Sequence, residues 1–381
     1  MHPETSAVHT GVYVDTAYNS VTTPIYTSSN FYFDALGKTR GYDYTRSGNP
    51  TRFALEQSLA ALEGGKHTIV TATGMAAVTT TLFLLKSGDH VVAGTDIYGG
   101  TYRLFSTIFP QMGVTFSFVD MRDPRKVEDA IQANTKMIWI ETPSNPLLYI
   151  TDIAAVAQIA RRRRIITVAD NTFLSPLHQK PLALGCDIVL HSTTKYLNGH
   201  SDVVGGAVIT ADDQLGAQLK AMCNALGTPC SPFDAFLVLR GIKTLPQRMA
   251  AHQRNATALA TWLDKHPQVK KVYFTGLDSH PQRELIARQQ TGHGGMLAFD
   301  IDAPPAKLDA FFGALELFLL AESLGGVESL VEQPWSMSHA SMGEAGLRAS
   351  GITPQTIRVS VGIEHIDDLI ADLEKGFAAI A

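Results

Sequence analysis

Short apolar segments alternate with segments of helical spacing through the middle of the chain. The apolar segments cover residues 91–93, 114–119, 137–140, 165–168 and 188–190, and the predicted helices between them cover residues 98–109, 124–133 and 152–163. Apolar strands joined by helices require right-handed crossovers, so the strands pair in parallel beneath helices on both faces. The pattern therefore predicts an α/β fold built on a mostly parallel sheet.

Polar or turn-forming residues directly follow several of the predicted strands. A strand from His67 leads to a tight turn at Gly74, and Asn145, Asp170 and Lys195 follow three later strands. Ligands of such sheets bind beyond the carboxyl ends of the strands, so one cleft can hold all four residues. A helix that begins at Gly74 exposes free backbone N–H groups, which favour an anion. Neither a Walker sequence nor Gly-x-Gly-x-x-Gly accompanies it, so a nucleotide is not implied.

Lys195 stands just beyond the apolar segment 188–190, beside the hydroxyls of Ser192 and Thr194. A lysine at the end of a buried strand must be paired or lose its proton. Schiff-base chemistry requires such a neutral amine, and the two hydroxyls can bind a phosphate. A lysine on a surface loop is equally compatible with this stretch alone.

Three further side chains, at the ends of predicted strands or inside one, stand where they need a partner group to bond or pack against. Asp170 ends a buried strand, where it needs a cation such as a protonated pyridine nitrogen, or backbone N–H groups in a structural role. Tyr98 follows another strand on a glycine-rich turn, where it can stack on a planar ligand or simply pack. Arg358 lies inside an apolar strand over residues 357–361, where it pairs with a substrate carboxylate or in a structural salt bridge.

The chain of 381 residues divides into three regions. Residues 1–60 have few periodic segments, which predicts an arm lying across the body of the protein or across a neighbouring subunit. Within the arm, Tyr44 and Arg46 suit either an anionic group or a well-satisfied turn. Residues 61–244 carry the alternating pattern, and residues 245–381 change to a long helix and mixed short segments, which predicts a smaller α+β domain.

Composition excludes several classes of protein. The formal net charge is −5 without a domain-scale basic patch, so nucleic acid is not an expected partner. Three cysteines without a Cys-x-x-Cys pair favour a reducing compartment and give no metal-site pattern. A basic-then-apolar leader and an apolar run of membrane-spanning length are both missing, which predicts a cytoplasmic protein without a membrane partner.

These segments together resemble the Cys/Met-metabolism family of pyridoxal-phosphate enzymes, fold type I, which has the aspartate-aminotransferase-like architecture. The family includes cystathionine γ-synthase, cystathionine γ- and β-lyases and methionine γ-lyase. The resemblance covers essentially the whole chain and rests on Tyr44-Thr-Arg-Ser-Gly-Asn-Pro-Thr-Arg, Thr73-Gly-Met-Ala, Tyr98-Gly-Gly-Thr-Tyr-Arg-Leu-Phe, Glu141-Thr-Pro-Ser-Asn-Pro, Asp170-Asn-Thr-Phe, Ser192-Thr-Thr-Lys-Tyr-Leu-Asn-Gly-His, Ala321-Glu-Ser-Leu-Gly-Gly-Val-Glu-Ser and Arg358-Val-Ser-Val-Gly.

The resemblance implies a role for each candidate residue. Lys195 is expected to form the Schiff base with pyridoxal 5′-phosphate and to move protons, Asp170 to pair with the pyridinium nitrogen, and Tyr98 to stack on the ring. Residues of two subunits are expected to hold the phosphate, namely Gly74, Met75, Ser192 and Thr194 from one and Tyr44 and Arg46 from its neighbour in a homotetramer. Three residues are expected to contact an amino-acid substrate, namely Arg358 at its α-carboxylate, Asn145 and Ser323.

The choice among family members rests on a few positions. Gly100 stands where methionine γ-lyase usually has a cysteine, and residues 182–192 and 196–206 resemble bacterial cystathionine γ-synthases. Ser47 replaces a second arginine found in some synthases, and Glu332 resembles the γ-lyases. We therefore expect γ-replacement on O-succinyl- or O-acetylhomoserine by cysteine, giving cystathionine, with cleavage of cystathionine by a γ- or β-lyase as the alternative. Arg103 is expected to face an ester leaving group, and Glu332 the distal ammonium of cystathionine.

Two other classes of protein fit less well. A non-catalytic binding protein on the same fold has no need of Lys195, Asp170, Tyr98 and Arg358 together. A nicotinamide-dependent dehydrogenase needs a glycine fingerprint and a ribose-binding acid, which the chain lacks.

Overall fold

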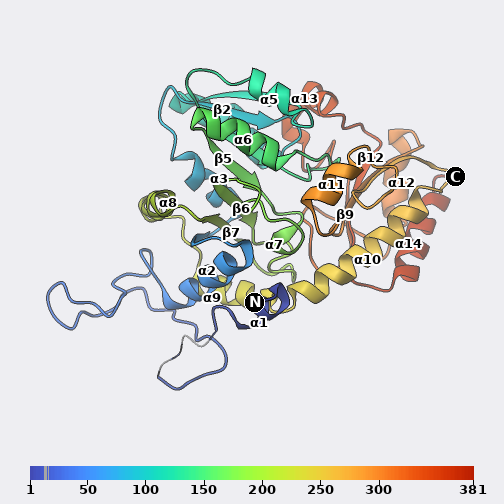
Figure 1. Ribbon diagram of the computed structural model, residues 1–381. Coiled ribbons are helices and arrows are strands. Elements are labelled where there is room, and N and C mark those ends of the chain that lie inside the picture. The colour runs from blue at the N-terminus through green and yellow to red at the C-terminus, as the bar shows by residue number, and fades with distance from the viewer. Residues whose placement is uncertain (13–14, 16) are drawn as a thin grey trace.

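The computed structural model describes residues 1–12, 15 and 17–381 and contains two sheets, one in each of two domains (Figure 1). The larger sheet has the strand order β1-β7-β6-β5-β4-β2-β3, in which β7 alone runs against the others. The mostly parallel sheet predicted from the sequence is thus confirmed. Its strands are β1 His67–Thr71, β2 His90–Gly94, β3 Thr115–Val119, β4 Thr135–Glu141, β5 Ile166–Asp170, β6 Ile188–Ser192 and β7 Gly206–Thr210.

Helices cover both faces of this sheet because its side chains alternate between two apolar cores. Ile69, Val91 and Trp139 pack on one face with the helices α3 and α8, whereas Val92 and Ile138 pack on the other face with α6. The predicted helix over 98–109 is instead split into three short pieces, with glycines at its start and Pro110 inside its last turn. The helices of this domain are α3 Gly74–Leu82, α4 Gly99–Arg103, the π-helical η1 Leu104–Ile108, the 3₁₀ turn η2 Phe109–Met112, α5 Pro124–Asp129, α6 Ile153–Arg163, α7 Ser175–His178, α8 Asp213–Leu226 and α9 Pro232–Ile242.

A long helix, α10 Leu245–Leu263, joins the two domains, because its first turns pack in the core of the larger domain and its last turns in that of the smaller (Figure 1). The smaller sheet has the order β10-β11-β12-β9-β8 and is covered by α10, α12 and α14. This domain comprises β8 Val269–Tyr273, α11 Arg283–Gln289, β9 Met296–Ile301, η3 Pro305–Lys307, α12 Leu308–Gly313, β10 Leu319–Leu320, β11 Leu330–Glu332, η4 Ala340–Met342, α13 Gly343–Ala349, β12 Thr356–Ser360 and α14 Ile366–Ala378.

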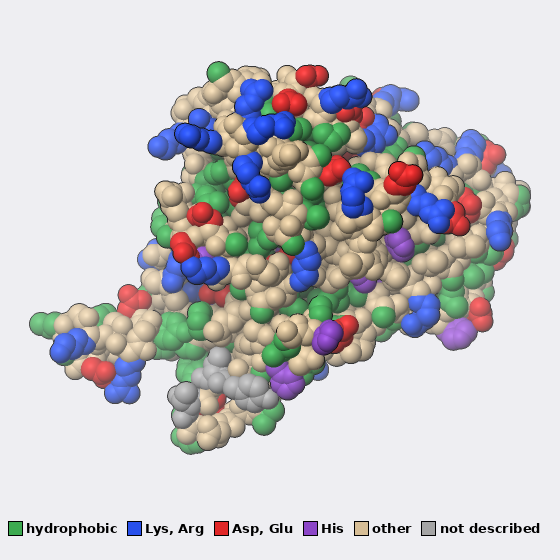
Figure 2. Space-filling model, viewed as in Figure 1, with side chains coloured by type: hydrophobic (Ala, Val, Ile, Leu, Met, Phe, Trp, Pro, Cys, Tyr) green, Lys and Arg blue, Asp and Glu red, His purple; other side chains and the backbone are tan. Residues whose placement is uncertain are grey.

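The N-terminal arm leaves the body as extended loops (Figures 1 and 2). The helix α2 Pro50–Glu63 begins within the region predicted as the arm and packs against β1 and α9. The helix α1 Pro3–His9 packs against α2 and α10. Between α1 and α2, the described residues form no helix and only isolated β-bridges.

The face shown in Figure 2 carries basic and acidic side chains interspersed with one another. Cys186, Cys223 and Cys230 are buried and form no disulfide. Within the described part of the chain, no helix combines the length and apolar character needed to cross a bilayer.

Candidate active site

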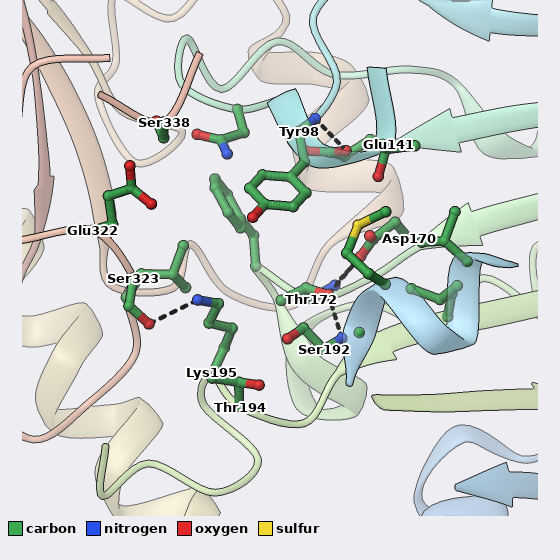
Figure 3. Close-up of a pocket in the computed structure, with 18 of the residues that line it drawn as sticks. Tyr98, Glu141, Asp170, Thr172, Ser192, Thr194, Lys195, Glu322, Ser323 and Ser338 are labelled. Atoms are coloured by element: carbon green, nitrogen blue, oxygen red, sulfur yellow. Dashed lines mark hydrogen bonds between the residues drawn. The ribbon is translucent and has the colours of Figure 1, made fainter. Parts of the chain in front are cut away.

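A cavity of about 340 Å³ lies beyond the carboxyl ends of β4, β5 and β6, and both domains contribute to its wall (Figure 3). It brings together residues that are far apart in the sequence but were all singled out from it: Gly74, Met75, Tyr98, Asn145, Asp170, Ser192, Thr194, Lys195, Ser323 and Arg358. The wall also contains residues that sequence reasoning did not single out, among them Glu141, Thr172, Glu322 and Ser338.

Lys195 follows β6 and points into the cavity, where its Nζ donates a hydrogen bond to Ser323 Oγ at 2.7 Å (Figure 3). Burial lowers the pKa of Lys195 to about 8, and the nearby Arg358 guanidinium adds to the effect, while Glu332 and Glu322 oppose it. Ser323 has a φ of 98°, a strained conformation for a residue other than glycine. The structure therefore holds an amine that loses its proton far more readily than an ordinary lysine.

Two carboxyl groups lie at the base of the cavity. Glu141 and Asp170 end the neighbouring strands β4 and β5 and are paired in register. Burial is the main cause that raises the pKa of each, and the Asp170 charge further raises that of Glu141. Thr172 donates from its N–H at 3.0 Å and from its Oγ1 at 2.5 Å to Asp170 Oδ1. Neither carboxylate forms an ion pair with any described residue, so the site favours a cationic group in the cavity.

The first turn of α3 offers an anion site beside β6. Thr73 caps the helix by accepting from Ala76 N at 2.8 Å, which leaves the N–H groups of Gly74 and Met75 without intrahelical partners. A Cβ added at Gly74 would lie 3.0 Å from both Cβ and Oγ of Ser192. Glycine therefore keeps open the space between the helix dipole and a hydroxyl, as a phosphate group requires.

The ring of Tyr98 lies at the cavity, and its backbone is held by Glu141 at the bottom of the cavity (Figure 3). Its N–H donates to Glu141 Oε2 at 2.9 Å. A Cβ added at Gly100 would lie only 2.5 Å from Cε1 of the ring. The ring can therefore occupy this position because residue 100 has no side chain, and it presents a flat face to a planar ligand.

Arg358 reaches the cavity from β12 of the smaller domain and is only 4% exposed. It donates through NH1 to Asn145 Oδ1 at 3.2 Å and through NH2 to the Ser323 carbonyl at 2.8 Å. These contacts fix the guanidinium plane next to Lys195 and tie the two domains together. A guanidinium held in this way suits the carboxylate of an amino acid.

Glu332 was predicted to contact the distal end of a substrate. It lies directly across from Arg358 in the pairing of β11 with β12, is 1% exposed and does not line the cavity. Its Oε2 lies 3.0 Å from Arg358 NH2, and its Oε1 contacts Ser338 Oγ. The cross-strand pairing with Arg358 therefore accounts for the position of Glu332, and its contact with the distal end of a substrate stays a prediction.

Three other predicted residues lie outside the cavity of this chain. Arg103, at the end of α4, is exposed and not part of the wall. Tyr44 and Arg46 lie on the arm, where Arg46 NH1 donates to the carbonyl of Asn224 in α8 at 3.1 Å. The structure of a single chain thus places neither Tyr44 nor Arg46 beside Gly74 and Ser192.

This chain is similar to known proteins along almost its whole length. The family model described as Cys/Met metabolism PLP-dependent enzyme matches residues 4–378. A cystathionine beta-lyase from Coxiella burnetii is 51% identical over 98% of this chain and 97% of the relative. A cystathionine gamma-lyase from Dictyostelium discoideum is 47% identical, covering 97% of this chain and 96% of the relative.

A solved structure is equally close. The crystal structure of cystathionine gamma synthase from Xanthomonas oryzae pv. oryzae in complex with cystathionine has a TM-score of 0.97 to this structure, at 50% identity, and covers 100% of this chain and 98% of that chain. The three relatives carry the names of three different reactions of one substrate class. The match of the family model to nearly the whole chain shows that this chain belongs to the Cys/Met-metabolism family of PLP-dependent enzymes.

Proposed function

We propose that the protein is a cystathionine γ-synthase, in which the sulfur of cysteine replaces the acyloxy group on the γ-carbon of O-succinyl- or O-acetylhomoserine, and succinate or acetate leaves. The observation that supports this proposal is that the wall of one cavity carries groups that suit two amino acids. Arg358 is buried beside Lys195, whereas Glu322 contributes an exposed carboxylate to the same wall. The first substrate binds by its carboxylate at Arg358, and Glu322 attracts the ammonium group of the incoming second amino acid.

The wall of the cavity offers partners for the aldehyde, the ring nitrogen, the ring face and the phosphate of pyridoxal 5′-phosphate. Lys195 would hold the aldehyde carbon, Asp170 the ring nitrogen and Tyr98 the ring face. The start of α3 with Ser192 would hold the phosphate. When bound, this cofactor withdraws electrons from the carbons of an amino acid, which allows a γ-substituent to leave.

The residues of the chain then supply orientation and proton transfer. Lys195, once neutral, can remove the proton at Cα and later move protons at Cβ, because its pKa of about 8 lies near the working pH. Ser323 positions Nζ through the 2.7 Å hydrogen bond. Arg358 holds the carboxylate so that Cα faces the amine.

Synthesis is favoured over cleavage for two reasons. Residues 182–192 and 196–206 resemble the stretches of bacterial synthases. In addition, Glu332, which resembles the γ-lyases, contacts Arg358 and Ser338, and these contacts argue against its selecting a distal ammonium. A γ-lyase is the second candidate, because Glu322 can also hold the distal ammonium of cystathionine.

The proposal includes assembly into a homotetramer in the cytoplasm, in which the arm completes a neighbour's site. Its support is the exposure of Tyr44 and of apolar arm residues such as Tyr18 and Leu36. Mixing Arg46→Ala with Lys195→Ala subunits should then restore part of the activity, since one site of each hybrid pair receives both native residues. Hybrids that form by mass but stay inactive would show that the arm serves its own chain.

The experiment that tests the activity uses purified protein loaded with pyridoxal phosphate. Cystathionine should form from either O-acylhomoserine and cysteine, and the Lys195→Ala variant should form none. With cystathionine alone, release of 2-oxobutanoate reports bond breaking at the γ-carbon and release of pyruvate at the β-carbon. Pyruvate as the main product, with no turnover of either O-acylhomoserine, would replace the proposal with a β-lyase.

A further inference from the structure

Arg358 presents a problem for the proposed function, because it already has an acidic neighbour. Glu332 Oε2 lies 3.0 Å from Arg358 NH2, and both side chains are almost fully buried, at 1% and 4% exposure. An ionised Glu332 would cancel the guanidinium charge that a substrate carboxylate needs. In a buried site, where charges are weakly screened, that cancellation is large. The protonation state of Glu332 therefore decides whether Arg358 can bind an anion.

Hydrogen bonds connect the two residues through a ring of groups that are buried except for Ser338, which is half-buried at the cavity wall. Arg358 NH1 donates to Asn145 Oδ1 at 3.2 Å, and the backbone carbonyl of Asn145 lies 3.0 Å from His339 Nε2. His339 Nδ1 lies 2.8 Å from Ser338 Oγ, and Ser338 Oγ contacts Glu332 Oε1. His339 has no exposed surface. The ring then closes at the Glu332–Arg358 pair.

The number of protons in this ring follows from the acceptors. A carbonyl only accepts, so His339 Nε2 carries a proton and donates it to Asn145. Ser338 has one hydroxyl proton but faces two atoms, His339 Nδ1 and Glu332 Oε1. If both of these atoms lack a proton, the hydroxyl can donate to only one of them, and a lone pair of Ser338 Oγ then faces a lone pair of the other. Satisfying every contact therefore requires one additional proton, either on Nδ1 or on Oε1.

We propose, as a refinement that rests on the proposed role of Arg358, that Glu332 carries this proton and donates it to Ser338, which in turn donates to a neutral His339. Glu332 is then a positioning residue. It packs against the guanidinium without neutralising it, and Arg358 with its ring keeps one net positive charge for the substrate carboxylate.

Two further observations favour the proton on Glu332 rather than on His339. Burial and the charge of Arg358 lower the pKa of His339 to about 3, whereas burial raises that of Glu332 despite the opposing effect of Arg358. The contact between Glu332 Oε2 and Arg358 NH2 is close but lacks the direction of a hydrogen bond, and Arg358 Nε has no partner among the described residues. An ionised carboxylate facing arginine would favour two aligned bonds.

Other charged groups also act on this ring and must be controlled. Lys195 and Glu322 face Glu332 from the cavity, and Glu141 and Tyr98 lie within reach of the Arg358 charge. Because these groups can titrate as well, a pH profile of the native enzyme alone reports more than Glu332. Comparison with a variant that changes only Glu332 isolates its contribution.

The test measures binding of butanoate, a carboxylate without an amine, to the loaded enzyme by calorimetry from pH 6 to pH 9. Glu332→Gln keeps the shape of a protonated carboxyl and can donate to Ser338, so its affinity at pH 7 should stay within about twofold of the native value. As pH rises, native affinity should fall relative to that of Glu332→Gln. A variant that binds about tenfold tighter at pH 7 would show that native Glu332 is ionised, and would overturn the proposal.

Two further measurements separate this proposal from the proposed function. Arg358→Ala should lose butanoate binding, and if it does not, the assigned role of Arg358 fails whatever the state of Glu332. The infrared spectrum at pH 7 should contain the carbonyl band of a protonated carboxyl that shifts in Ser338→Ala, where Glu332 loses its acceptor. No shift in that band would overturn the proposal even if Glu332→Gln does not fold.

Discussion

The pKa of Lys195, about 8, predicts how fast the apo-protein captures its cofactor at each pH. Only the neutral amine attacks an aldehyde. At pH 7 about one Lys195 side chain in ten is neutral, compared with about one in three thousand for a lysine of pKa 10.5, a roughly 300-fold difference. The rate constant for covalent attachment should therefore rise about tenfold per pH unit below pH 8 and level off above it.

Rapid mixing of apo-protein with pyridoxal phosphate measures this profile through the visible absorbance of the linked form. Borohydride reduction followed by peptide mass mapping should then locate the label at Lys195. N-acetyl-lysine amide, measured in the same buffers, provides the profile of an unperturbed amine. If the protein profile follows that of the model amine and keeps rising beyond pH 9, burial does not set the reactivity of Lys195.

Three other perturbations follow from the same geometry. Because the folded apo-protein binds the Lys195 proton more weakly than the unfolded chain does, the buried ammonium destabilises it by at most about 3 kcal/mol below pH 8. Lys195→Met should raise the melting temperature at pH 7, and the gain should shrink as pH rises from 8 towards 10.5; a constant gain would contradict this. Gly100→Ala should displace the Tyr98 ring and weaken retention of the cofactor about fivefold, because a stacking contact worth about 1 kcal/mol is lost. The control Gly313→Ala, which has open space around the added Cβ, should retain the cofactor as the native protein does. Asn171→Ala removes the buried amide that donates to Glu63 at 2.9 Å and to two backbone carbonyls. Urea unfolding of the apo-protein should show that this variant loses about 3 kcal/mol of its free energy of unfolding. The control Thr257→Ala, at an exposed position, should show no such loss.

The parallel strands and the inner end of the site were predictable because both leave local signals. A buried apolar strand is visible as a run of residues, and a charged residue at its end stands out, as Asp170 and Lys195 do. Glu141 gives the same signal at the end of β4, and the reasoning applied to Asp170 would have found it. The strand β7 Gly206–Thr210 was missed because Gly205 and Gly206 stand at its start, where paired glycines indicate a turn rather than a strand.

The residues that came out differently depend on contacts between distant parts of the chain. Glu332 was expected at the distal end of the substrate, but its neighbour across the sheet is Arg358, and strand register is not visible in one sequence. Glu322 and Ser338 lie in irregular segments of the smaller domain, where no periodicity marks them. The arm was predicted as a region of its own. The point where it joins the body depends on the packing of α2 against β1, a contact between parts of the chain that the sequence alone does not show.

The most direct measurement compares synthesis with cleavage in one preparation. The kcat/KM for an O-acylhomoserine at saturating cysteine is divided by the kcat/KM for cystathionine cleavage to 2-oxobutanoate, at the same pH and enzyme concentration. Both reactions use Lys195 and Arg358, so the ratio is insensitive to the fraction of loaded sites. A cystathionine γ-synthase predicts a ratio well above one, whereas rapid cleavage without turnover of either O-acylhomoserine would contradict it and identify a lyase.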